Sequence, residues 1–215
     1  MAVKIGGRSG TSEKGSGGGT SLALALGIAL LAGTGVVTAI GNATPSGEAS
    51  ISADDRSDAP TGSRVGTSDS AAAEARIVGK GVRLTATVTA DSTDCVADSY
   101  GRIQDFFRRT PCAGLHRAHF ELRDQDGDAA VVAVSWVAMP DEASARALEQ
   151  LMDTSGTGNV TELSRERGRY RTVRFTGDAY ASHRDGPVVV NAQAEPVTRG
   201  WTGPALTGIA TTAAQ

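Results

Sequence analysis

The sequence predicts an α+β fold in which an antiparallel sheet carries two main helices packed on one face. Stretches that alternate apolar and polar residues flank short Asp-Gly turns at 126–127 and 185–186, a pattern that is typical of β-hairpins. Two other stretches, residues 96–109 and 140–153, repeat apolar residues at helical spacing. Hairpins combined with such helices favour an antiparallel sheet with a helical layer.

The first strand is expected over residues 81–89, where apolar and polar residues alternate. The apolar positions, which should share one face of this strand, are Val82, Leu84, Ala86 and Val88. The first helix is expected over residues 96–109, with Asp94 as its N-cap and Pro111 ending it. Its apolar stripe consists of Val96, Tyr100, Ile103 and Phe107. This stripe indicates that the helix packs against the sheet.

A hairpin is expected over residues 115–123 and 129–139, around the turn at Asp126 and Gly127. On its first strand, one face would carry His116, Ala118, Phe120 and Leu122. The opposite face, which we expect to contact water, would carry Arg117, His119, Glu121 and Arg123. The second strand is apolar on both faces, so it should lie in the centre of the sheet.

The pattern continues toward the C-terminus and then weakens. The remaining expected elements are a helix over 140–153, a strand over 169–176, and a hairpin over 179–184 and 188–195. After Pro196 the periodicity fades, and residues 204–212 would form at most a short, weak helix. We therefore expect residues 201–215 to be a C-terminal tail.

An uncharged apolar stretch, residues 21–40, lies near the N-terminus. It is about as long as a bilayer-spanning helix, which needs ~20 apolar residues. Lys4, Arg8 and Lys14 precede it, so the N-terminus should be cytoplasmic and the rest of the chain extracytoplasmic. The alternative is a cleaved secretory signal, because small residues suited to a signal peptidase occur at 37–43. The expected location is the cell membrane, with one pass through the lipid bilayer, or else the secreted fraction.

The segments on both sides of the apolar stretch lack the composition of a folded core. Residues 1–20 are rich in Gly and Ser, and residues 41–75 combine Ser, Thr, Gly, Ala and Asp. We expect a disordered cytoplasmic tail and a disordered tether, followed by the folded domain over residues 76–200. The net charge of −3 gives none of the basic character that nucleic-acid binding requires.

The two cysteines of the chain, Cys95 and Cys112, both follow the apolar stretch. In an oxidising extracytoplasmic compartment we expect them to form a disulfide, within one chain or between two. A helix of 11–14 residues between them would separate its ends by roughly 16–21 Å, whereas bridged Cα atoms lie closer than about 7 Å. The bridge therefore closes within one chain only if the helix is short, from about Asp98 to about Arg108.

No pattern in the sequence indicates a catalytic site, a cofactor or a metal. His116 and His119 are three residues apart on an expected strand, so they point to opposite faces and would not share a metal. The acids at 124, 126 and 128 fit a hairpin turn better than a calcium loop, which would need Gly at position 129. A run of arginines would form either a solvated face or a basic patch for an anionic partner. It comprises Arg165, Arg167, Arg169, Arg171 and Arg174.

Several stretches between Asp94 and Glu195 resemble a family of uncharacterised actinobacterial proteins. They are DCVADSYGRIQDFF, TPCAGLHRAHFELRD, WVAMPDEASARAL, GTGNVTELSRERGRYRTVRFTG and VVVNAQAEP. The resemblance implies a single extracytoplasmic α+β domain behind a signal or anchor segment and a low-complexity tether. It implies no particular chemistry.

These observations predict a membrane-tethered extracytoplasmic domain that binds an unknown cell-envelope protein or ligand. The alternatives are an anchored or secreted enzyme of unknown reaction and a structural protein of the envelope. A deep apolar pocket with convergent polar groups, including His119 or Glu121, would favour the enzyme.

Overall fold

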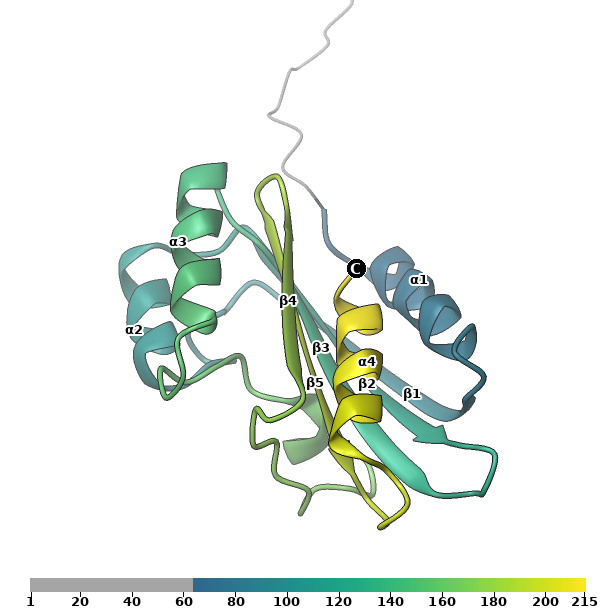
Figure 1. The fold of residues 1–215 in the computed structure, drawn as a ribbon. Coiled ribbons are helices and arrows are strands. Elements are labelled where there is room, and N and C mark those ends of the chain that lie inside the picture. Colours follow the sequence, from purple (N-terminus) through teal and green to yellow (C-terminus); the bar gives the residue numbers. More distant parts are fainter. Residues whose placement is uncertain (1–63) are drawn as a thin grey trace, which may run out of the picture. The chain divides into compact units, whose positions relative to one another are not determined.

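The computed structural model describes residues 64–215, which form a five-stranded antiparallel sheet and four α-helices (Figure 1). The expected α+β class is therefore confirmed. In chain order the elements are α1 (Thr67–Val78), β1 (Arg83–Ser92), α2 (Gly101–Arg109), β2 (Gly114–Arg123), β3 (Ala129–Ala138), α3 (Glu142–Met152), the short 3-10 helix η1 (Leu163–Arg165), β4 (Tyr180–Asp185), β5 (Val188–Pro196) and α4 (Gly203–Ala214).

The expected N-terminal tail, the membrane span and most of the tether lie outside the described residues. In the part of the chain that the structure does describe, no helix has the length and apolar character needed to cross a bilayer. The span over residues 21–40 therefore stays a prediction.

Strand β3 lies in the centre of the sheet, whose order is β1-β2-β3-β5-β4. Every residue of β3 is buried, which confirms the position predicted from its apolar sequence. Its small Ala and Val side chains allow helices to cover the strand from both sides. The hairpins β2–β3 and β4–β5 form as expected, with Gly127 and Gly186 in their turns at positive φ, 88° and 53°.

Helices cover both faces of the sheet (Figure 1). Helices α2 and α3 pack on one face, where Phe107 and Leu148 are buried in one cluster with Val137 of β3. These are the two main helices that the sequence places on a single face. Helices α1 and α4 pack on the opposite face, against side chains such as Phe120 of β2 and Val132 of β3. The domain thus has three layers, with the sheet in the middle.

Helices form in the segments that the sequence predicts to be the tether and the C-terminal tail, where only a short, weak helix over residues 204–212 was expected. Helix α1 begins within the predicted tether, 41–75, and α4 occupies most of the predicted tail, 201–215. Both are rich in Ala, and neither has the strongly amphipathic pattern from which a helix is recognised. Their stability comes from tertiary burial, because Ala73 and Ile77 of α1 share one core with Ala210 of α4.

A β-bulge in β1 separates residues that the sequence places on one face. The register with β2 shifts between Leu84 and Ala86, which adds a residue to β1 and reverses the side-chain alternation. Leu84 therefore packs with the core beneath α1 and α4. Val88 lies on the opposite face, since it pairs with His119 of β2. The predicted single apolar face is wrong because alternation alone does not reveal an inserted residue.

The face of β2 that was expected to contact water is buried. Arg117, His119 and Glu121 are only 4%, 1% and 4% exposed, because the chain after α3, including η1, crosses over them. The predicted strand over 169–176 does not form, and this stretch consists of turns and irregular chain. Its residue Arg169 instead donates a hydrogen bond to the carboxylate of Glu121, at 2.7 Å. Side-chain pairing with a buried acid therefore replaces strand pairing here.

Candidate functional site

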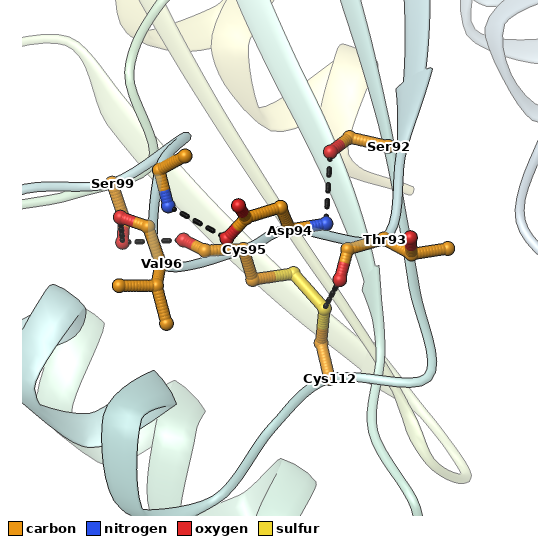
Figure 2. The surroundings of a disulfide bond; sticks show 8 residues. Ser92, Thr93, Asp94, Cys95, Val96, Ser99 and Cys112 are labelled. Atoms are coloured by element: carbon orange, nitrogen blue, oxygen red, sulfur yellow. Dashed lines mark hydrogen bonds between the residues drawn. A yellow bond between two sulfur atoms is a disulfide. The ribbon is translucent and has the colours of Figure 1, made fainter.

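Cys95 and Cys112 form the expected disulfide within one chain, with Cα atoms 6.2 Å apart (Figure 2). The geometric condition for closure is met because α2 is short. It begins at Gly101, and the residues from Cys95 onward form turns. Asp94 caps this turn rather than the helix, since its carboxylate accepts a hydrogen bond from the Ala97 N–H at 3.0 Å. The bridge ties the end of β1 to the chain that enters β2.

The predicted basic patch is exposed but partly neutralised. Its members are Arg165, Arg167, Arg169, Arg171 and Arg174, all on the surface. The guanidinium of Arg165 lies 2.7 Å from the carboxylate of Glu162, and Arg169 pairs with Glu121. Both acids are themselves buried. Arg169 therefore ties this segment to the sheet, whereas Arg165 pairs within the segment itself.

A layer of charged side chains lies between β2 and the segment that crosses it. The guanidinium of Arg117 pairs with Asp98 at 2.9 Å and with Glu166 at 2.6 Å. Glu121 pairs with Arg169 in the same layer. Both buried charges thus have opposite partners, as buried charges require. We interpret this layer as the structure that holds the crossing segment in place.

His119 belongs to this buried layer. Neither of its ring nitrogens has a hydrogen-bond partner within residues 64–215. Burial lowers the pKa of His119, and the nearby Glu121 carboxylate opposes this effect more weakly. A cavity of only about 10 Å³, lined in part by Arg117, Ser135 and Gln193, lies next to the layer and is about the size of one water molecule. The layer therefore offers no room for a substrate.

The free energy of unfolding should fall as the pH is lowered below about 6.5, the ordinary histidine pKa. His119 takes up a proton at a higher pH in the unfolded chain than in the folded one. Acid therefore favours unfolding through this group, by at most ~1.4 kcal/mol per pH unit. Urea unfolding measured between about pH 7.5 and about pH 5 checks this expectation.

The contribution of His119 is isolated by substitution. A His119→Leu variant should show a shallower dependence of unfolding free energy on pH. The exposed His183 supplies the matched control, because His183→Gln should keep the slope of the wild type. Equal slopes for His119→Leu and the wild type would contradict the assignment.

A larger cleft, of about 430 Å³, lies between the loop after α3, the start of α2 and strands β4 and β5. Its volume is within the range of ligand sites, ~300–1,000 Å³. Three aromatic side chains line it, namely Tyr100, Phe175 and Tyr180. Two carboxylates and two amides also line it, from Asp153, Asp178, Asn159 and Gln193. We call this site the aromatic cleft.

Other grooves on the described residues offer fewer groups for a ligand. Their volumes are about 460, 520 and 350 Å³. None of the three has more than one Trp, Tyr or Phe in its lining. Trp136 is only 4% exposed, and the indole N–H of Trp201 already donates to the Asp128 carbonyl at 3.1 Å. The aromatic cleft is therefore the strongest candidate for a ligand site.

Asp153 forms one wall of the aromatic cleft. Its carboxylate accepts hydrogen bonds from the Tyr180 hydroxyl at 3.0 Å and from the Ser182 hydroxyl at 2.7 Å. Burial, and then the Asp153 charge, raise the pKa of Tyr180 well above its usual range. Burial, and then the charge of Glu162, raise the pKa of Tyr100 as well. Both tyrosines therefore remain neutral at physiological pH.

Tyr100 is positioned by a close approach of two backbone segments. The Arg102 N–H donates to the Thr157 carbonyl at 2.7 Å, so the loop after α3 caps the first turn of α2. Gly101 and Gly158 meet at this contact, and both have positive φ, 67° and 91°. Glycine at both positions allows the loop to approach the helix closely enough to place Tyr100 at the edge of the cleft.

Sequence reasoning missed the aromatic cleft. Its residues come from the start of α2, the loop after α3, the chain before β4 and strand β5, and only the tertiary structure brings them together. Tyr100, which the sequence places in the buried stripe of a helix, is 39% exposed at the N-cap of α2. The signal that was available is Gly158 in the loop after the expected helix, since a glycine can mark a close backbone approach.

Comparison with known proteins found no matching family model, no matching curated protein and no matching solved structure. Within residues 64–215, no three His, Cys, Asp or Glu side chains are grouped so that they would hold a metal ion. The function is therefore inferred from the aromatic cleft and the disulfide.

Proposed function

We propose that this chain is a membrane-tethered extracytoplasmic binding domain. Residues 21–40 would anchor it in the bilayer, and the domain would bind a ligand or a cell-envelope partner in the aromatic cleft. The observation that carries the proposal is the cleft itself. Three aromatic rings and four side-chain carboxylates and amides converge there around about 430 Å³, which is the composition expected of a recognition site.

The disulfide supports the proposed location. Cytoplasmic thiols are kept reduced, whereas disulfides persist outside the cytoplasm, and the Cys95–Cys112 pair is bridged. The basic residues that precede residues 21–40 support a cytoplasmic N-terminus. A cleaved signal would release the same domain as a secreted binding protein.

The lining of the aromatic cleft favours recognition over catalysis. It contains no His among the described residues, and His is the most frequent general base in enzymes. His119 and Glu121, the groups that an enzyme would present in a pocket, are buried in the charged layer instead. The cleft thus offers rings and hydrogen-bonding groups without a histidine base.

Protease treatment of intact protoplasts that produce the full chain tests the topology. We expect external protease to remove the domain and to leave a short stub in the membrane, because the N-terminus is cytoplasmic. If the mature protein instead begins near Asn42 or Thr44 and accumulates in the medium, residues 21–40 are a cleaved signal and the domain is secreted.

Affinity capture from a cell-envelope extract tests the binding role. The full chain in a non-ionic detergent should retain an envelope component, and Asp178→Lys should lose it, because this exposed residue lines the cleft. Asp126→Lys is the matched control, since it makes the same charge change at an exposed site outside the cleft. Equal capture by the wild type and Asp178→Lys would remove the support for binding in the cleft.

A further inference from the structure

We infer that the aromatic cleft recognises an alkylammonium group, carried by a free amine or by a lysine side chain, and this inference rests on the proposed binding function. The charge of the lining is the first argument. Asp153 and Asp178 line the cleft, and no Lys, Arg or His does so among the described residues. Neither carboxylate forms an ion pair within residues 64–215. The cleft therefore has a negative potential that attracts cations.

Two arginines near the cleft, Arg184 and Arg165, are engaged with other acids. Arg184 on β4 pairs with Glu149 of α3 at 3.0 Å. Arg165 pairs with Glu162 at 2.7 Å, and its guanidinium also lies 5.7 Å from the centroid of the Tyr100 ring. Neither of these two arginines forms an ion pair with Asp153 or Asp178.

The aromatic rings supply the second argument. Tyr100, Phe175 and Tyr180 line one cleft, and the faces of such rings attract ammonium groups and pack against alkyl chains. The raised pKa values of the two tyrosines keep their rings neutral. Carboxylates together with neutral rings therefore favour a ligand that has both a positive charge and an apolar chain.

An amide of the cleft lining supplies the third argument. Gln193 lines the cleft and is only 6% exposed. The amide oxygen of Gln193 would accept one of the three N–H donors of a primary ammonium group. The carboxylate of Asp153 would accept another, because only its Oδ1 is engaged, by Tyr180 and Ser182.

Titration of the full chain in non-ionic detergent with 1,4-diaminobutane, followed by ligand-observed NMR, tests this inference. We expect saturable binding that weakens with added salt. The neutral counterpart 1,4-butanediol should bind at least about tenfold more weakly, because it lacks the charge–carboxylate and cation–π contacts. Equal affinities for the diamine and the diol would overturn the inference.

Three variants test whether the diamine binds in the aromatic cleft. Asp178→Asn and Tyr100→Ala change exposed cleft residues and should each weaken diamine binding several-fold, whereas Asp126→Asn should leave it unchanged. The urea midpoint of each variant must match that of the wild type, so that a lost signal reports binding and not unfolding. Asp153→Asn is a poorer choice, because Asp153 also holds Tyr180 and Ser182. Diamine binding that survives both cleft variants would overturn the inference.

The source of the ammonium group is distinguished with Nα-acetyl-lysine amide and its Nε-acetylated form. Binding of the lysine derivative, lost on acetylation, assigns the cleft to lysine side chains, and binding of the diamine alone assigns it to free amines. If envelope capture depends on Asp178 while neither amine binds, the inference fails and the proposed function stands. If the amines bind but envelope capture is the same for the wild type and the cleft variants, the inference stands and the proposed binding of an envelope partner in the cleft fails.

Discussion

Replacing Gly158 by alanine should lower the free energy of unfolding by about 2–6 kcal/mol. A Cβ atom at this position would lie under 3.0 Å from the backbone carbonyl of Tyr100, and a backbone carbonyl cannot turn aside as a flexible side chain can. Gly158 also has a φ of 91°, which residues with a Cβ rarely adopt. Backbone strain and overpacking each contribute ~1–3 kcal/mol, which together give the expected range. Urea unfolding of the full chain measures the loss.

Gly156→Ala separates the two causes. Gly156 has a φ of 80°, but a Cβ there would meet nothing within 4 Å, so only the conformational strain of about 1–2 kcal/mol remains. Because Gly158 lies against Tyr100, Gly158→Ala should also weaken diamine binding, whereas Gly156→Ala should affect it less. If the two variants lose the same stability, the close approach of the loop to α2 is not what constrains Gly158.

Removing the disulfide with Cys95→Ser and Cys112→Ser together should lower the free energy of unfolding by about 3 kcal/mol. The two cysteines are separated by 17 residues, and closing a loop of this length restricts the unfolded chain. For a domain of this size the loss corresponds to a decrease in Tm of roughly 6–12 °C. Thermal unfolding followed by circular dichroism measures it.

Reduction of the wild type provides the control for the serine variant. Dithiothreitol should lower the Tm of the wild type by nearly the same amount and should leave the double variant unchanged. The bridge lies next to the turn that leads into α2, so its loss should also increase hydrogen exchange at the start of that helix. A wild type whose Tm is insensitive to reduction would show that the bridge adds no stability.

The elements that the sequence predicts correctly are those with strong local signals. The apolar residues of β3, on both faces, indicate a central strand, and the Asp-Gly turns at 126–127 and 185–186 indicate the two hairpins. The disulfide required one further step, since the limit on Cα separation predicts a shortened helix. Helix α2 does begin only at Gly101. Geometry and local pattern were enough for these features because each depends on residues that are close in sequence.

The features that the sequence did not reveal depend on distant contacts. Helices α1 and α4 have weak patterns of their own, and they are stable because each buries Ala side chains such as Ala73 and Ala210 against the sheet. The polar face of β2 looks solvated in sequence, yet Arg169 reaches Glu121 from a segment far along the chain. A buried ion pair and a water-exposed charge have the same local sequence signature, so only the fold distinguishes them.

The sequence by itself predicted the α+β class, the two hairpins, the two main helices and a disulfide between the two cysteines, because periodicity and turn chemistry act locally and the chain has one pair of cysteines. Only the tertiary structure decided which polar groups are buried and which form a site. The aromatic cleft is the clearest case. Tyr100, Asp153, Phe175 and Gln193 meet because β5 lies beside β3 and because two glycines allow a loop to contact α2. These residues are brought together by tertiary packing, so no short stretch of the sequence indicates the cleft.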